Sequence, residues 1–350
     1  RSIYSTLMRG QACLPEAGLS ATIRSRTRNR WLRDGKCANY IAPARTTLTK
    51  FKFEVAEMEA AKDVRKGIVT YLLLTAAFSS VFYYFIISAG TIGVWGGLGA
   101  FGIMWCPGTA ALLTCRLHHR SLKSLGWGWG KTRYQLVSYL LPLAYAAVVY
   151  LPVWLFGLGE FTADFPSQVA QRFGWDALPQ GAVIILFLLF AGTFGMLSSC
   201  VFALGEEIGW RGFLVPELAK ITTFSRTALL SGAIWAAWHA PGIFFADYHS
   251  TTPRWYALLC FTLMVIGMSF AFAWLRVKSG SLWTATLLHA SHNLFIQAVF
   301  DKLTRDTGIT NWLIGEFGAG LAIAAVLVGI IFWKRRFDLP DTSLRPQPVA

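Results

Sequence analysis

The sequence predicts an all-α fold, a polytopic membrane bundle of about eight transmembrane helices with both termini in the cytoplasm. Of the 350 residues, 55% are hydrophobic and only 14% are charged, whereas about a quarter of the residues of a soluble protein are charged. Several apolar runs also reach the roughly 20 residues that cross a hydrocarbon core. These runs are much longer than the ~10 residues of a barrel strand, and lipid offers backbone amides no water, so each run is predicted to be a helix.

Eight runs meet this criterion, and their approximate bounds are 67–90, 92–114, 134–158, 181–204, 226–246, 255–275, 282–300 and 311–333. Basic residues gather in every second loop, which the positive-inside rule assigns to the cytoplasm. They are Lys62, Arg65, Lys66, Arg116, Arg120, Lys123, Lys131, Arg133, Arg276, Lys278, Lys334, Arg335 and Arg336. The intervening loops 159–180 and 301–310 are acidic or balanced, which gives the orientation stated above.

The first 53 residues contain eleven Lys and Arg against two acids. A basic segment can bind nucleic acid, but a solvated tail or a contact with anionic lipid fits a membrane protein better, and we expect no nucleic-acid partner. The acid-poor composition also fits an organelle transit peptide. Because the chain begins with Arg1 and Met58 opens a compact flank before the first run, an upstream extension covering residues 1–57 is a third interpretation. All three stay open.

The first polar cluster is Glu206-Glu207 with Arg211, directly after the fourth run. In a helix, Glu207 and Arg211 form an i,i+4 pair with the acid first, the favourable order, while Glu206 is rotated by about 100°. Glu207 is therefore expected to be a structural ion-pair partner. Glu206 remains available as a general base that takes a proton from water. Ionisable groups at membrane depth are costly, so this cluster predicts a functional site.

The second cluster is His239, one helical turn after Trp235 and two residues before Pro241. Proline lacks an amide donor and tends to kink or end a helix, so the backbone near His239 is expected to be irregular. A lone histidine here could equally be a hydrogen-bonded packing residue.

The third cluster places His289 and Asn293 on one helix face at i,i+4, where an imidazole and an amide can converge on one oxygen atom. His292 is rotated by about 60° from His289 and is a candidate for a supporting role. In the deduced topology all three clusters approach the cytoplasmic side. We therefore expect one shared cavity near that side.

Taken in order, Glu-Glu-x-x-x-Arg, aromatic-x-x-x-His and His-x-x-x-Asn resemble the motifs of the CAAX-protease and bacteriocin-processing family of intramembrane proteases. This family includes the type II prenyl-protein endopeptidases and the bacterial Abi-type proteins. The resemblance covers roughly residues 180–305. One position departs from the pattern, because Trp235 stands where the family commonly has Phe.

The resemblance implies a site made of Glu206, Glu207, Arg211, His239, His289 and Asn293. In it, Glu206 and His239 activate a water molecule, and His289 and Asn293 stabilise the oxyanion. No cofactor is certain, but two histidines and a carboxylate can hold Zn²⁺ with a water position open, and Glu206, His239 and His289 would then be the ligands. The sequence has no His-Glu-x-x-His helix, and its spacing does not decide between metal and metal-free chemistry.

The chain then divides into a basic extension at residues 1–57 that is expected to be disordered, N-terminal transmembrane helices at 58–180, a catalytic core at 181–305, and a last helix with a tail at 306–350. The expected function is endopeptidase cleavage of membrane-associated peptides or proteins, including prenylated CAAX-type substrates, in a bacterial plasma membrane. The expected partners are the lipid bilayer and the substrate. The alternatives are a catalytically silent scaffold or bacteriocin-immunity protein, and a proton-coupled transporter, which would show internally repeated halves.

Overall fold

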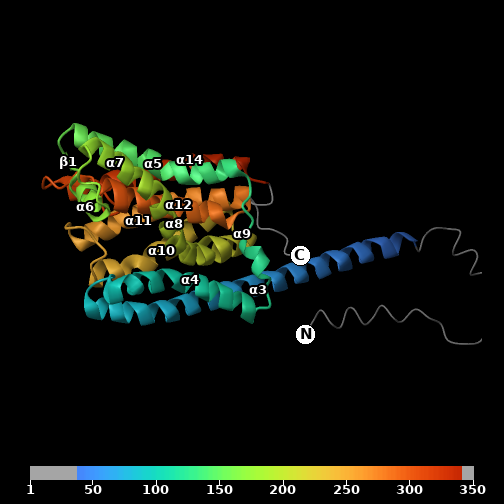
Figure 1. Ribbon diagram of the computed structural model, residues 1–350. Helices are drawn as coiled ribbons and strands as arrows, with labels where there is room; N and C mark the ends of the chain where they lie inside the picture. Colours follow the sequence, from blue (N-terminus) through green and yellow to red (C-terminus); the bar gives the residue numbers. More distant parts are fainter. Residues whose placement is uncertain (1–37, 341–350) are drawn as a thin grey trace, which may run out of the picture. The chain divides into compact units, whose positions relative to one another are not determined.

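The computed structural model describes residues 38–340, and nearly all of this part of the chain is helical (Figure 1). The chain divides into two compact units, residues 1–59 and 60–350. The first unit is described only from Ala38, where helix α3 (Ala38–Ala89) begins. Residues 38–57 are thus helical where a disordered extension was expected, and residues 1–37 lie outside the described residues.

The second unit is a bundle of antiparallel helices. Its first half, after α3, contains η2 (Val94–Gly97), α4 (Leu98–Leu117), η3 (Leu122–Leu125), α5 (Thr132–Leu155), strand β1 (Glu160–Phe161) and α6 (Asp164–Phe173). A long helical segment follows and consists of α7 (Gln180–Phe190), η4 (Ala191–Gly195), α8 (Met196–Glu207), η5 (Ile208–Leu214) and α9 (Val215–Ile221). The η4 and η5 segments are π-helical, a rare conformation that is frequent at functional sites.

The remaining elements are α10 (Phe224–Phe245), α11 (Arg254–Ser279), α12 (Leu282–His292), the π-helical η6 (Asn293–Phe300), strand β2 (Thr304–Arg305), α13 (Thr310–Leu313), α14 (Ala319–Lys334) and η7 (Arg335–Asp338). The two strands pair antiparallel. The loops at one end of the bundle, 90–97, 156–163, 246–253 and 301–318, include these strands, and we call this the strand end. The opposite end holds the basic loop 118–131 and the short loops 222–223 and 280–281, and we call it the basic end (Figure 1).

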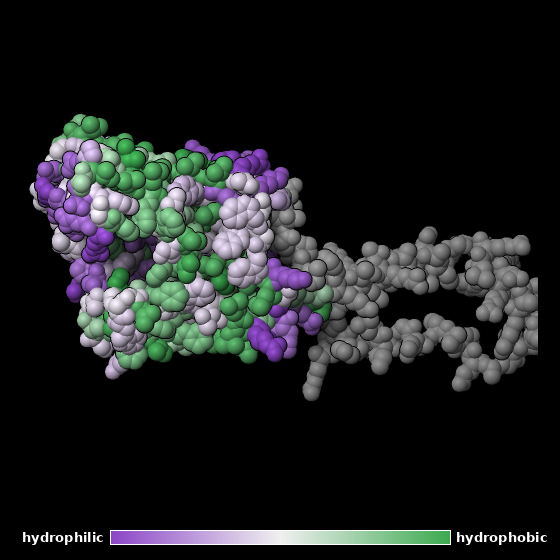
Figure 2. Space-filling view, viewed as in Figure 1, coloured by the Kyte–Doolittle hydropathy of each residue, from purple (hydrophilic) through white to green (hydrophobic). Residues whose placement is uncertain are grey.

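Six helices in the described part of the chain are long and apolar enough to cross a membrane. They are Val55–Ala89, Val94–Leu117, Thr132–Leu155, Gln180–Ile221, Phe224–Phe245 and Arg254–Ser279. Large apolar side chains are exposed along the bundle, and Figure 2 shows them between two more hydrophilic ends. Because a bilayer would cover such a surface, the predicted polytopic helical membrane fold is confirmed.

The seventh and eighth predicted spans differ from the structure. The run 282–300 corresponds to α12 and η6 together, whereas the run 311–333 is not a single helix. Only the part Ala319–Lys334 forms the long helix α14, and the chain before it turns at Gly315, whose φ is +72°. A positive φ suits glycine because it has no Cβ. The turn brings Glu316 into the interior of the bundle, where this acid is 6% exposed.

Small residues allow the helices around the core to approach closely. A Cβ atom on Gly267 of α11 would lie 2.6 Å from the carbonyl oxygen of Ala325 on α14. On α8, a Cβ atom on Gly205 would lie 2.8 Å from the carbonyl oxygen of Met104 and 2.7 Å from the Trp105 ring. Close approach of this kind is how membrane helices gain packing contacts. At Gly205 it fixes the position of the next residue, Glu206.

A buried contact at the strand end holds the turn that carries Glu316. The Tyr150 hydroxyl on α5 donates to Asp301 Oδ1 at 2.5 Å and accepts the amide N–H of Gly315 at 3.0 Å. Burial raises the pKa of Asp301 to about 7; the charge of Glu316 adds to the shift, while the Tyr150 hydrogen bond and Lys302 oppose it. The turn at Gly315 is thus tied to α5 beside a carboxyl group that titrates near neutral pH.

This contact predicts a specific pH dependence of stability. The pKa of Asp301 is about 7 in the folded protein and about 3.9 in an unfolded chain, so folding is favoured by its protonation. That stabilisation is complete below about pH 4 and is lost as the pH rises through 7. In detergent, the unfolding temperature of the wild type should fall between pH 5 and 8 by more than that of Asp301→Asn, which stays neutral. Parallel pH profiles for the two proteins would contradict the assignment.

Candidate active site

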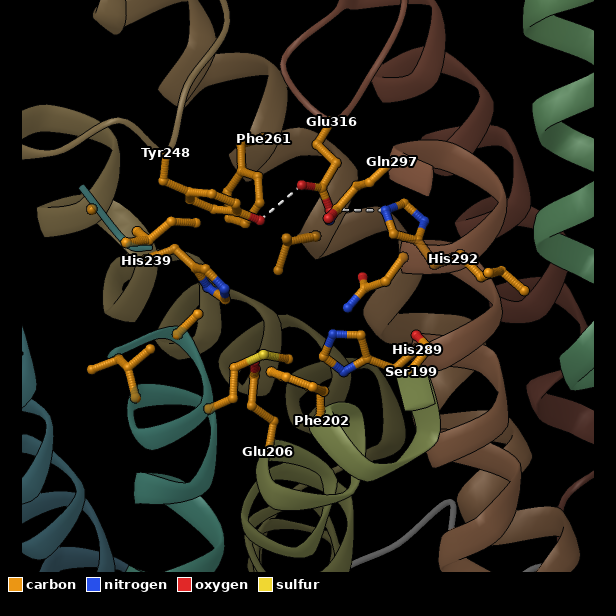
Figure 3. A pocket seen from close by; sticks show the side chains of 18 of the residues that line it. Ser199, Phe202, Glu206, His239, Tyr248, Phe261, His289, His292, Gln297 and Glu316 are labelled. Atoms are coloured by element: carbon orange, nitrogen blue, oxygen red, sulfur yellow. Dashed lines mark hydrogen bonds and ion pairs between the residues drawn. The ribbon is translucent and has the colours of Figure 1, made fainter. Parts of the chain in front are cut away.

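One cavity of about 560 Å³ lies within the bundle, and most of its walls are apolar. Glu206, His239, His289 and Asn293, the four side chains expected to converge, all line it. Figure 3 draws Glu206 from α8, His239 from α10 and His289 from α12 around a common space. Figure 2 shows a recess in the bundle surface near the strand end. The three motifs, separated by up to 87 positions between Glu206 and Asn293, thus meet in one place.

Glu206 is held by two tryptophans. Its Oε2 atom accepts hydrogen bonds from the indole N–H of Trp235 at 2.8 Å and of Trp210 at 3.2 Å, and the side chain is 1% exposed. An indole can only donate, so this pair orients the carboxylate without competing for its proton. Both contacts use Oε2, which leaves Oε1 for a water molecule in the cavity. Trp235 therefore does more than fill the space of the family's phenylalanine.

Glu207 forms the predicted ion pair with Arg211, with 2.8 Å between Oε1 and Nη1, and both side chains are almost completely buried. The same Oε1 atom lies 2.9 Å from Nδ1 of His289. The guanidinium of Arg211 lies between two rings, 4.1 Å from the centroid of Trp235 and 3.9 Å from that of Phe272. Cation–π contacts of this kind help a buried charge that has lost its water. Glu207 therefore orients His289, a link that the motif spacing did not indicate.

His239 lies across the cavity from His289. Its Nδ1 atom is 3.0 Å from the carbonyl oxygen of Trp235, and the rings of Trp238 and Phe261 lie 4.7 and 4.8 Å from its ring centroid. An N–H at Nδ1 can donate to that carbonyl, which leaves the Nε2 lone pair for the cavity. The prediction of an irregular backbone near Pro241 is wrong, because helix α10 continues past this residue to Phe245.

A further group of polar side chains lines the same cavity and was only partly foreseen. His292, predicted to have a supporting role, contacts the Tyr145 hydroxyl through Nδ1 and Glu316 Oε1 through Nε2, the latter at 3.0 Å. The Tyr248 hydroxyl donates to Glu316 Oε2 at 2.8 Å. Glu316 was missed because it lies in a run that was assigned to a continuous helix. A glycine on each side of it, Gly315 and Gly318, was the available signal.

The cavity does not lie at the end of the bundle that we expected. Tyr248, Lys302 and Glu316 line it and belong to loops of the strand end, whereas the prediction placed it near the basic, cytoplasmic loops. The error arises in the fourth span, which was assumed to end near residue 204. That helical segment runs on through η5 and α9 to Ile221, so Glu206 lies deep within the bundle.

The proposed zinc ligands do not form a metal site in the structure. Among the side chains of residues 55–340, no three His, Cys, Asp or Glu are grouped so that they could hold a metal ion. Glu206 Oε2 is occupied by two indole donors, and both imidazoles use Nδ1 for contacts with protein atoms. Glu206 Oε1 and Nε2 of both imidazoles stay unoccupied by protein atoms, so a zinc ion at these three residues stays a prediction, and the chemistry below uses side chains and water.

Comparison with known proteins agrees with this geometry. Residues 182–295 match the family model described as type II CAAX prenyl endopeptidase Rce1-like, and this interval contains all three motifs. A CAAX prenyl protease 2 from Methanococcus maripaludis is 27% identical over 197 residues, which are 55% of this chain and 64% of that protein. The aligned part thus spans just under two thirds of that relative. The predicted resemblance is confirmed for this region: residues 182–295 are similar to the type II CAAX prenyl endopeptidase Rce1-like family.

Proposed function

We propose that this protein is an intramembrane endopeptidase that hydrolyses peptide bonds of membrane-associated proteins or peptides. One observation carries the proposal: Glu206, His239, His289 and Asn293 line a single, mostly apolar cavity inside a membrane bundle. Peptide hydrolysis needs a base, a confined water and donors placed where negative charge develops, and these residue types supply them. A scaffold or immunity protein of the same fold would not need Glu206.

In the first step, Glu206 acts as the general base. A water molecule placed between Glu206 Oε1 and His239 Nε2 gives a proton to the carboxylate, and its oxygen attacks the carbonyl carbon of the substrate. The indole donors on Oε2 keep the carboxylate in one orientation, so the base does not have to be reoriented during the reaction. His239 accepts a hydrogen bond from the same water and fixes its position.

In the second step, His289 and Asn293 stabilise the oxyanion of the tetrahedral intermediate. The Asn293 amide can donate from Nδ2, and His289 donates from Nε2 when its ring carries both protons. The Glu207 carboxylate beside Nδ1 compensates the charge of that ring. When the intermediate collapses, the carbon–nitrogen bond breaks and Glu206 returns its proton to the leaving amine. The products are a carboxylic acid and an amine, which exchange a proton in water to give a carboxylate and an ammonium group, and Glu206 is ionised again.

Two observations support membrane-anchored substrates: the names of the similar proteins and the apolar walls of the cavity. The family model and the archaeal relative are both named for CAAX prenyl proteases. An apolar cavity at membrane depth suits a peptide that carries a lipid or an apolar segment. We therefore propose membrane-anchored substrates, prenylated CAAX-type proteins among them, and a bacterial plasma membrane as the location.

The role of Glu206 can be tested with Glu206→Gln, which keeps the shape but removes the base. Loss of a general base lowers the rate by about 10² to 10⁴-fold. The purified variant should therefore show a fall of this size in peptide cleavage, with an unchanged unfolding temperature. Wild type and variant would be incubated in detergent with a membrane-peptide library, and the products would be identified by mass spectrometry. Full activity in the variant would end the proposed mechanism.

The role of Glu207 predicts a different phenotype for Glu207→Gln. Gln cannot neutralise Arg211, and removing one partner of a buried ion pair costs about 3 to 5 kcal/mol. The variant should therefore lose both thermal stability and activity, whereas Glu206→Gln loses activity alone. Thermal unfolding and cleavage would be measured on the same preparations. Equal activity loss with unchanged stability in both variants would contradict this division of roles.

Metal removal gives a third test, because the cavity donors do not form a three-ligand group. After dialysis against EDTA and then metal-free buffer, the cleavage rate should stay within about twofold of the untreated rate, since a metal-free base mechanism loses nothing. Adding Zn²⁺ to the dialysed protein should not raise the rate. Loss of activity that Zn²⁺ restores would show that a metal is required.

A further inference from the structure

A second carboxylate lines the catalytic cavity. Glu316 is 94% buried, since only 6% of its surface is exposed, and it lies in the turn before α14. Figure 3 draws Glu316, Tyr248 and His292 on one side of the pocket and Glu206 on the other. None of the three motifs contains Glu316 or Tyr248, and the mechanism above does not use either residue.

The hydrogen bonds around Glu316 leave it negatively charged. Tyr145 is 4% exposed, and its hydroxyl needs an acceptor, which Nδ1 of His292 provides if that nitrogen carries no proton. His292 then donates from Nε2 to Glu316 Oε1. Burial raises the pKa of Tyr248 well above its usual value, so its hydroxyl stays protonated and donates to Oε2. Every donor has an acceptor in this arrangement, and the carboxylate keeps its charge.

No lysine or arginine among the described residues balances that charge. Glu316 has no Lys or Arg ion-pair partner in residues 55–340, in contrast to Glu207 with Arg211 and Glu217 with Arg120. Lys302 also lines the cavity, but it is exposed and its Nζ atom lies 5.6 Å from the ring centroid of Phe165. A buried carboxylate without a cation is costly, and a cation that enters the cavity would lower this cost.

We propose that Glu316 binds a positively charged group of the substrate peptide, an amine or a guanidinium, and so selects substrates that carry one near the cleaved bond. This inference rests on the proposed endopeptidase function and adds a specificity determinant to it. Tyr248 and His292 hold the carboxylate with one hydrogen bond on each oxygen, which leaves further lone pairs for the ligand. The amide of Gln297, drawn on the same side of the pocket, offers another acceptor (Figure 3).

Matched peptides provide the test. Peptides that the wild type cleaves in the library would be resynthesised with each Lys or Arg replaced by norleucine, and with free or acetylated amino termini. The second pair separates an amino-terminal amine from a side-chain cation. The values of kcat/KM would be compared for the wild type, Glu316→Gln and a control, Glu160→Gln. The control makes the same chemical change on the exposed strand β1.

For the wild type, removing the cation from the peptide should lower kcat/KM by about tenfold, the scale of a charge-assisted hydrogen bond. Glu316→Gln should lose this preference and cleave the neutral peptides within about twofold of the wild-type rate. Glu160→Gln should keep it. The proposal fails if the wild type shows no preference, or if Glu316→Gln lowers cleavage of charged and neutral peptides equally, because the role is then structural.

Two further measurements keep the inference separate from the proposed function. Tyr248→Phe removes one of the two donors to Glu316, so its preference for charged peptides should weaken without vanishing. This variant tests the inference even if Glu316→Gln does not fold. If the wild type cleaves no peptide, the endopeptidase proposal fails, but the carboxylate can still be probed with n-butylamine and n-butanol. The amine should raise the unfolding temperature of the wild type more than the alcohol does. For Glu316→Gln, the amine and the alcohol should have equal effects. Equal shifts of the wild type from the two compounds would overturn the inference.

Discussion

The contact on which the site depends is the buried carboxylate of Glu207, whose Oε1 atom meets both Arg211 and His289. It joins α8 and η5 to α12, so the segment that bears Glu206, the proposed general base, and the segment that bears His289, a proposed oxyanion donor, share one charged atom. A charge at this depth is tolerated only with partners, and here they are a guanidinium and an imidazole. Arg211 also lies between the rings of Trp235 and Phe272, so the two contacts of Glu207 Oε1 hold the residues around the cavity in place.

Arg211 extends this network toward the basic end. Its carbonyl oxygen accepts a hydrogen bond from Nε of Arg276 at 2.9 Å, and Arg276 also donates to the carbonyl oxygen of Leu125 in the loop between α4 and α5. These carbonyls belong to irregular or π-helical backbone, where the usual helical acceptors and donors are displaced. Arg211 therefore has two structural roles. Its side chain neutralises Glu207, and its carbonyl oxygen binds Arg276 near the C-terminal end of α11.

The sequence predicted what short-range geometry and hydrophobicity determine. Spacing alone gave the Glu207–Arg211 pair, and the apolar runs gave a membrane bundle. It could not give the contact of Glu207 with His289, because 82 positions separate the two residues and only the packing of α8 on α12 brings them together. It also missed Glu316, since a hydropathy window averages one acid over an apolar run and cannot detect that Gly315 turns the chain. The position of Glu206 was predicted wrongly for a related reason. The polar cluster was taken as the end of the fourth span, whereas the helical segment continues to Ile221.

The turn at Gly315 is informative because non-helical backbone that is buried in protein needs partners for its polar groups. Here the turn is held by Tyr150, whose hydroxyl accepts the Gly315 amide, and it presents Glu316 to the cavity. The Gly315 amide thus has a hydrogen-bond acceptor in Tyr150, whose own hydroxyl proton is accepted by Asp301. A continuous helix over 311–333 would have needed neither contact, and the turn in its place puts a second acid, Glu316, opposite Glu206. The cavity therefore has two chemically distinct sides, one that can activate water and one that can hold a cation, with apolar walls between them.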